Sequence, residues 1–463
     1  MSFFKIKSLP GTTWPPLPFP ETSLIWSAYQ TLDKTQWLKP SEIQELQLQQ
    51  VNTLLKHCYD NVPYYHQLLD SIYQFDKPVT SLIDFRRIPL LTRTLYQQNF
   101  EQIKAIKLPD GMQLNQTSTF TSGTNGVPIE VLKTNRNDLW WIAFSMRDFE
   151  WCKMDPRKRI AAIRLIAMSN ADLPAALEGI SSSSWLPPGI MESGPAFGLD
   201  IRQDPKLQIK WLKKISPSYL ISLPSNLDVL AGMLQESGQK IASLESIQAI
   251  GETLTPEVKQ RIELAFGVPV YNLYSANECG YIASQCPWGH GFHVHAENVL
   301  TEVLDEDDNP CAPGQTGRLV FTNLINFATP FIRYDILDDV TLASASCPCG
   351  RGLPLLTKIE GRRHPMLFLS DGRRKASTGL MLGIRQIGGV HQFQIIQHTM
   401  DHFTIRVVPN QTWTEEYGKL MQAYVQNEVE SDVRVDIEKQ TVLERPNGKL
   451  KIVEVELEKS DGK

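Results

Sequence analysis

Residues 246–280 read SIQAIGETLTPEVKQRIELAFGVPVYNLYSANECG. The apolar runs Ser246–Ile250 and Val268–Leu273 have the composition of buried strands, and Pro256–Ala265 between them is predicted to be a helix. The order strand, helix, strand indicates a parallel βαβ unit. Polar loops that follow such strands are where α/β proteins bind ligands.

The same alternation extends over residues 115–360, where Arg159–Ile166 and Tyr219–Leu223 are further strand-like runs. Residues 297–342 differ, because their short strands are divided by Asp, Asn, Pro and Gly. They predict a small antiparallel β subdomain, with strands at Val299–Leu304, Gly317–Asn323 and Asp339–Leu342.

The two ends of the chain have other patterns. Residues 1 to about 105 read as helical, and the last 100 or so residues predict a compact α+β domain. Gly361-Arg362-Arg363-His364-Pro365 marks the change. We therefore expect an α/β protein with a large N-terminal domain over residues 1–361 and a small C-terminal domain over residues 362–463.

Composition narrows the function classes. A chain of 463 residues is long enough for two or more domains. The net charge of −5 gives no sign of nucleic-acid binding. The proline-rich N-terminus does not read as a secretion signal, and no apolar run is long enough to span a membrane. We expect a cytoplasmic protein.

Four segments carry chemistry-bearing residues. Thr117–Pro128 is rich in hydroxyls and glycines that can wrap a polyphosphate, although it lacks the Gly-Lys-Ser/Thr ending of a Walker loop. In the turn after Leu273, Tyr274 could flank a base and Glu278 could bind Mg²⁺. Pro330–Asp339 offers carboxylates for a ribose, and Arg445–Lys451 presents lysines that could stabilise a transferring phosphoryl group. Taken singly, each also fits an ordinary polar turn.

The order of these segments resembles the adenylate-forming superfamily. A hydroxyl-rich loop, Gly-Glu, Tyr-x-x-x-Glu, Arg-Tyr-x-x-x-Asp, a Gly-Arg hinge and a late Gly-Lys follow one another at that family's rough spacing. The chain looks most like the phenylacetate–CoA ligase branch and its capsule-biosynthesis-type relatives. Asn61–His66 and Ile88–Thr92 resemble that branch as well. The resemblance covers nearly the whole chain.

The resemblance implies specific roles for residues. ATP phosphates would contact the loop residues Ser122, Gly123, Thr124 and Gly126, and Thr124 would also assist catalysis. Glu278 would hold Mg²⁺, and Lys449, rather than Lys451, would serve the adenylation step. The rest of the nucleotide site would comprise Gly251, Glu252, Asn272, Tyr274, Ser275, Asp338 and Arg362.

The implied reaction joins a carboxylic acid to AMP, releases pyrophosphate, and passes the acyl group to coenzyme A or a carrier-protein phosphopantetheine. An amide-forming ligase and a non-catalytic nucleotide-binding relative are the alternatives. Val127 departs from the family pattern at the phosphate loop, and His364-Pro365 departs from it at the hinge. These departures weaken the prediction of the acyl-transfer step more than the prediction of the adenylation step. The resemblance is also compatible with a homodimer.

The resemblance also implies that the aromatic-rich helix over Asn137–Met146 lines the acid pocket through Trp141, Phe144 and Ser145, although aromatic stripes on helices are more often core. The acid expected from the resemblance is an aryl or small acyl acid.

Three of the seven cysteines cluster with a histidine. Cys286, His290, Cys347 and Cys349 would make a tetrahedral zinc site, with His293 or His295 as the alternative ligand. The alternative interpretation, without a metal, is that three free thiols lie near one another by chance. A closed set of four ligands would be structural and leave no catalytic position.

Overall fold

A computed structural model describes residues 4–72, 78–120, 129–166, 179–187, 189–362, 366–371, 373–430, 432–443 and 450–456. The chain divides into two compact units. The first comprises residues 1–224 and 240–362, and the second comprises residues 225–239 and 363–463. No helix in the described ranges is long and apolar enough to cross a membrane.

The first unit is built on one mixed sheet, which has twelve strands among the described residues. Its order is β11-β12-β13-β14-β10-β9-β8-β7-β6-β3-β5-β4. The central strands from β5 to β8 run parallel. Their bounds are β3 Ile160–Arg164, β5 Ala196–Asp200, β6 Tyr219–Ser222, β7 Ser246–Ile250 and β8 Val270–Ala276, and the edge strand β4 is Ile180–Ser182.

The other half of the sheet is antiparallel. Its strands are β9 Gly280–Gln285, β10 Phe292–Val294, β11 Val299–Leu304, β12 Thr316–Asn323, β13 Tyr334–Leu342 and β14 Leu355–Arg362. The predicted strands of residues 297–342 are therefore present, but they continue the main sheet through β14, β10 and β9. Sequence pattern alone gave no sign of this connection, because it depends on pairing between distant segments.

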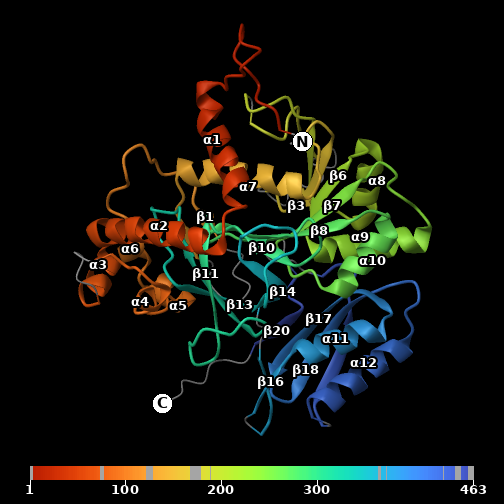
Figure 1. The fold of residues 1–463 in the computed structure, drawn as a ribbon. Helices are drawn as coiled ribbons and strands as arrows, with labels where there is room; N and C mark the ends of the chain where they lie inside the picture. The colour runs from red at the N-terminus through yellow and green to blue at the C-terminus, as the bar shows by residue number, and fades with distance from the viewer. Residues whose placement is uncertain are drawn as a thin grey trace. The chain divides into compact units, whose positions relative to one another are not determined.

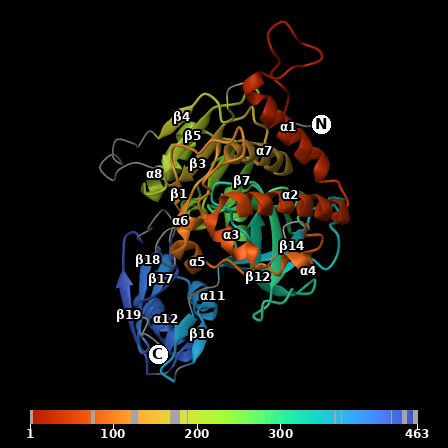
Figure 2. The same cartoon turned by 90° about the vertical axis from the view of Figure 1, so that its left-hand side faces the viewer.

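Helices cover this sheet in two groups. Figures 1 and 2 show α2 and α3 beside the antiparallel strands, and buried residues such as Val51, Leu54 and Leu319 share one core cluster there. A second cluster joins α1 to α7 through Tyr29 and Phe144. The helices are α1 Pro20–Thr35, α2 Pro40–Asn61, α3 Pro63–Asp70, α4 Leu82–Phe85, α5 Arg93–Gln98, α6 Phe100–Ile103, α7 Asn135–Trp151, α8 Pro205–Ile215 and α10 Pro256–Phe266.

Prolines begin many of these helices, which explains why their starts are readable from sequence. Proline at the first helical position has no N–H to leave unpaired, and its φ is already helical. Pro40 and Pro256 are two examples, and the preceding Thr255 accepts a hydrogen bond from Val258 N–H at 3.4 Å. The predicted helix at residues 256–265 is confirmed with one extra residue.

The second unit is an α+β body. Its described residues form a sheet of order β19-β18-β17-β20, and Figure 1 shows α11 and α12 over one face of it. Leu380, Ile405 and Met421 belong to its core. The elements are α9 Pro224–Ser237, β15 Met366–Phe368, β16 Arg374–Ala376, α11 Thr378–Ile387, β17 Val390–Thr399, β18 His402–Pro409, α12 Glu415–Glu428, β19 Arg434–Lys439 and β20 Val453–Val455.

Candidate active site

The carboxyl ends of β7 and β8 lie together, because these neighbours pair in parallel from Ile247 opposite Val270 onward. Gly251 and Glu252 directly follow β7, and Glu278 lies in the turn that follows β8. Glu278 is only 4% exposed, which is unusual for a carboxylate. Two of the predicted nucleotide-binding segments therefore meet at one edge of the sheet.

Asp338 reaches the same edge from β13. The Tyr274 hydroxyl donates a hydrogen bond to Asp338 Oδ2, although three strands, β9, β10 and β14, separate β8 from β13 in the sheet order. Burial, and then the charge of Asp338, raise the pKa of Tyr274 well above its ordinary value, so the phenol stays a neutral donor. The residue before Asp338, Leu337, has a left-handed backbone with φ of 65°, at the point in β13 where the pairing with β12 is irregular.

A third segment joins them at the end of β14. The Cα atoms of Arg362 and Asp338 are register partners. A β-carbon at Gly361, where φ is 79°, would collide with Thr253 Oγ1, so only glycine lets β14 approach the Gly251–Thr253 turn. Gly251, Glu252, Tyr274, Asp338 and the backbone of Arg362 thus lie near one another.

Two cations near Glu278 were missed by sequence reasoning. Arg93 Nη1 lies 3.9 Å from Glu278 Oε1, and Lys133 lines the same small cavity as Glu278. Arg93 is the first residue of α5, whose N-cap Thr92 accepts from Leu95 N–H at 3.2 Å. The signal available in the sequence was only adjacency: Arg93 directly follows the segment Ile88–Thr92.

Asn272 and Ser275 lie on β8 itself. The Asn272 N–H donates to Gln285 Oε1 at 3.1 Å, and Ser275 sits at an irregularity in the pairing of β8 with β9. Both side chains are half-buried. They flank Tyr274 along the strand that carries the predicted adenine-binding segment.

Several predicted residues lie outside the described ranges. These are Ser122, Gly123, Thr124, Gly126 and Val127 of the phosphate loop, His364 and Pro365 of the hinge, and Lys449. The loop's flanks are described: β1 (Thr119–Phe120) pairs with β2 (Glu130–Val131), with Thr119 opposite Val131. The loop therefore connects the two strands of a hairpin. Lys451, the alternative to Lys449, is ion-paired to Glu454 Oε1 at 2.9 Å.

The predicted acid-pocket residues divide between pocket and core. Trp141 and Phe144 line the cavity beside Glu278. The Ser145 hydroxyl donates to Trp141 O at 2.8 Å and lies 3.0 Å from the Tyr281 hydroxyl. Helix α7 therefore contributes two walls, while Ser145 holds Tyr281 in place.

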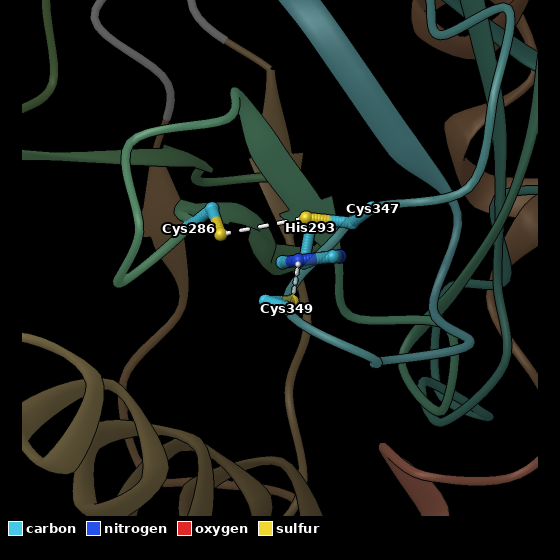
Figure 3. A group of neighbouring side chains, drawn as sticks. All are labelled: Cys286, His293, Cys347 and Cys349. Atoms are coloured by element: carbon cyan, nitrogen blue, oxygen red, sulfur yellow. Dashed lines mark hydrogen bonds between the residues drawn. The ribbon is translucent and has the colours of Figure 1, made fainter.

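The cysteine cluster forms at the opposite end of β9. Figure 3 shows Cys286, His293, Cys347 and Cys349 turned toward one centre. Their ligand atoms all lie within 4.8 Å of one another, and all four residues are buried. The Cys286 and Cys347 sulfurs are 3.7 Å apart, close to the roughly 3.8 Å edge of a tetrahedron with zinc–sulfur bonds of about 2.3 Å.

His293, not His290, completes this group. His290 is exposed, in the loop between β9 and β10, whereas His293 Nε2 lies 3.2 Å from Cys349 Sγ. His293 Nδ1 lies 3.4 Å from Leu353 O, the kind of bond that fixes a ligating tautomer. Burial lowers the pKa of His293 to about 4, so its imidazole is neutral. Burial raises the pKa of Cys347 to about 12, so its thiolate needs a neighbouring cation. These donors fit zinc.

Comparison with known proteins indicates the class of protein to which this fold and site correspond. Residues 115–327 match the family of AMP-binding enzymes, and this range includes Tyr274 and Glu278. This part of the chain is therefore similar to AMP-binding enzymes, and the resemblance to adenylate-forming enzymes is confirmed.

Relatives of known activity match most of the chain. The phenylacetate-coenzyme A ligase of Thermus thermophilus is 24% identical over 400 residues, which are 82% of this chain and 85% of that protein. The phenylacetate-coenzyme A ligase of Escherichia coli is 24% identical over 347 residues, 73% of this chain and 75% of that protein. The structure of 2-hydroxyisobutyryl-CoA ligase with an acyl-AMP aligns with a TM-score of 0.70 at 20% identity, covering 91% of each chain. This protein thus has the fold of acyl-CoA ligases.

Proposed function

We propose that this protein is an acid–thiol ligase that activates a carboxylic acid with ATP as an acyl-adenylate and transfers the acyl group to coenzyme A. The observation that carries the proposal is the convergence of Glu278, Asp338 and the Gly251–Thr253 turn at the carboxyl ends of β7 and β8. The matches to AMP-binding enzymes and phenylacetate-coenzyme A ligases support the same reaction.

In the first step, the substrate carboxylate attacks the α-phosphate and pyrophosphate leaves. Such a displacement depends on positioning and on neutralising charge. Asp338, oriented by Tyr274, would accept hydrogen bonds from the ribose hydroxyls. Glu278 would hold Mg²⁺, because its carboxylate is buried and Arg93, the cation that pairs with it among the described residues, lies 3.9 Å away. Bound Mg²⁺ supplies positive charge to the phosphates.

The phosphate loop and the late lysine complete the proposal. The loop's hydroxyls and N–H groups, at Ser122–Gly126, would donate to phosphate oxygens. Lys449 would stabilise the charge that develops as pyrophosphate leaves. Lys451 already pairs with Glu454, which favours Lys449 for this role.

The test supplies ATP, Mg²⁺ and a panel of aryl and short aliphatic acids, with coenzyme A, a phosphopantetheine carrier protein or an amine as acceptor. We expect acyl-CoA and AMP, detected by mass spectrometry. If the acyl group were transferred only to the carrier protein, or only to the amine, that molecule and not coenzyme A would be the acceptor. ATP binding without any adenylate would support a non-catalytic relative.

We also propose that Cys286, His293, Cys347 and Cys349 bind a structural zinc ion. The four donors form a closed set, with no position left for substrate. Metal analysis of the purified protein is expected to give one zinc per chain, and a Cys349→Ser variant is expected to lose it. Stoichiometric zinc in that variant would contradict the assignment.

A further inference from the structure

A small cavity opens beside Glu278 at the start of β9. Its volume is about 70 Å³. Aromatic walls enclose one side, and polar side chains from the β2–α7 connection and the start of α7 enclose another. The lining residues used below are Lys133, Asn137, Asp138, Trp141, Phe144 and Glu278.

The aromatic walls are fixed by packing. A β-carbon at Gly280 would stand 3.5 Å from the Trp141 ring, so this ring lies directly over the glycine. The Trp141 and Tyr281 rings are 4.7 Å apart, and Phe144 is 1% exposed. A cavity of about 150 Å³ holds benzene, so a cavity half that size has no room for a phenyl ring. Its size fits a short aliphatic acid.

Lys133 is the unusual member of the lining. It lies two residues beyond β2 and is half-buried. Burial lowers its pKa, while the charges of Cys279, Asp138 and Glu278 oppose this change. Among the described residues, its Nζ has no hydrogen bond or ion pair within 4 Å. Its ammonium group lines the cavity and can therefore donate hydrogen bonds to an anionic or hydrogen-bond-accepting ligand.

The neighbouring polar groups add amide donors from Asn137 beside the carboxylates of Asp138 and Glu278. Asn137 Oδ1 accepts from the Thr134 N–H at 2.8 Å and from the Thr134 hydroxyl at 2.9 Å, and in the described part of the chain its amide hydrogens have no such partner. Asp138 Oδ2 already accepts from Asn115 at 3.0 Å. Lys133 and Asn137 therefore offer N–H groups to an oxygen atom in the cavity.

We propose that Lys133, with Asn137, selects short carboxylic acids that carry a second oxygen-bearing group, and binds that second oxygen. This inference rests on the proposed acid-activating function. A carboxylate, a hydroxyl or a keto oxygen shares the required chemistry, since each accepts hydrogen bonds from an ammonium group. Lys133 is a specificity residue and takes no part in the bond-making step.

The experiment measures acid-dependent pyrophosphate release with malonate, 3-hydroxypropionate, pyruvate, butyrate and phenylacetate. For the wild type, kcat/KM is expected to be highest for one of the three acids with a second oxygen. Comparison of malonate with 3-hydroxypropionate and pyruvate identifies the group. Lys133→Met, which keeps the length and removes the charge, is expected to lower kcat/KM for that acid by roughly 10-fold or more relative to butyrate. Lys133→Arg should retain most of the preference.

Controls separate this role from others. Lys107→Met removes one positive charge at an exposed position and should leave the preference unchanged. An equal loss for every acid in Lys133→Met, or a raised KM for ATP alone, would overturn the assignment, because either result places Lys133 at the nucleotide. A wild-type preference for phenylacetate or butyrate would also overturn it, while leaving the proposed function intact. Absence of pyrophosphate release with all acids would instead refute the proposed function itself.

Discussion

The two ends of β9 illustrate two uses of one strand. Before its first residue lies Glu278, a buried carboxylate beside a cavity, with Arg93 at 3.9 Å. After its last residue lies Cys286, whose sulfur belongs to a closed group of four buried ligands. The first end leaves room for a ligand to enter and the second end does not. At the structural site the polar groups already contact one another, whereas at the reactive site the carboxylate remains available to a ligand.

The largest effect is expected at the open end. Glu278→Gln keeps the shape of the side chain and removes the charge that would hold Mg²⁺. We expect kcat for acid-dependent pyrophosphate release to fall by about 100-fold or more, with little change in Tm. A variant with full activity at ordinary Mg²⁺ concentrations would remove Glu278 from the chemistry.

The closed end should show the reverse pattern. Cys349→Ser opens the group of four ligands, and we expect Tm to fall by roughly 5 °C or more. Well below the new Tm, pyrophosphate release per folded molecule should stay within about 2-fold of the wild type. Scanning calorimetry and the kinetic assay test the two halves of this statement. Loss of catalysis without loss of stability would show that the two ends are not separate in function.

Asp148 on α7 offers a further test, because its side chain is hydrogen-bonded to Ser284 of the same strand. This buried residue of α7 accepts a hydrogen bond from Gln248 on β7 and is bonded to Ser284 on β9. Burial raises its pKa from 3.8 to about 6 despite these bonds. The pKa of Asp148 is higher in the folded state than in the unfolded state, so the protonated carboxyl stabilises the fold. This contribution to the free energy of unfolding is complete below about pH 4 and is lost as the pH rises through 6.

Asp148→Asn stays neutral at every pH, so it should gain stability relative to the wild type as pH rises. We expect the difference in unfolding free energy to grow by roughly 1–3 kcal/mol between pH 4 and pH 7. Urea unfolding at both pH values measures it. The change with pH is the relevant quantity, since a packing defect from the amide would shift both values equally. A difference that does not vary with pH would mean that Asp148 titrates normally.

The smallest effect is expected at Tyr274. Tyr274→Phe removes only the hydroxyl that donates to Asp338. We expect the KM for ATP to rise by roughly 3- to 10-fold with kcat little changed, because one hydrogen bond to a charged group is lost. Steady-state kinetics with varied ATP checks this. An unchanged KM would show that Asp338 needs no help to bind the ribose.

Much of the fold was readable from local pattern. Val299–Leu304 and Ser246–Ile250 have the predicted bounds, and Pro256 marks the start of its helix. Apolar runs and helix-starting prolines act over a few residues, which explains this success. The strands β5, β9 and β10 were not predicted. They contain glycine or are short, and their places in the sheet are determined by distant partners.

The candidate site was partly readable for the same reason. Tyr274, Glu278 and Asp338 lie in ordered motifs, whereas Arg93 and Lys133 belong to none of the motifs that carried chemistry. The histidine of the proposed zinc site shows the limit of spacing arguments. His290 is nearer to Cys286 in sequence, but Cys286 N–H pairs with Gly291 O, so the intervening residues form an exposed hairpin loop. His293, on β10, is thereby carried back toward the cysteines.

The most direct test of the central claim is acid-dependent exchange of labelled pyrophosphate into ATP. This exchange requires that an acyl-adenylate form reversibly in the site, and it needs no acyl acceptor. We predict exchange that requires both Mg²⁺ and an acid, is supported by at least one short acid, and is lost in Glu278→Gln. Exchange that persists in Glu278→Gln, or a wild-type protein that binds ATP yet shows no exchange with any acid, would contradict the account.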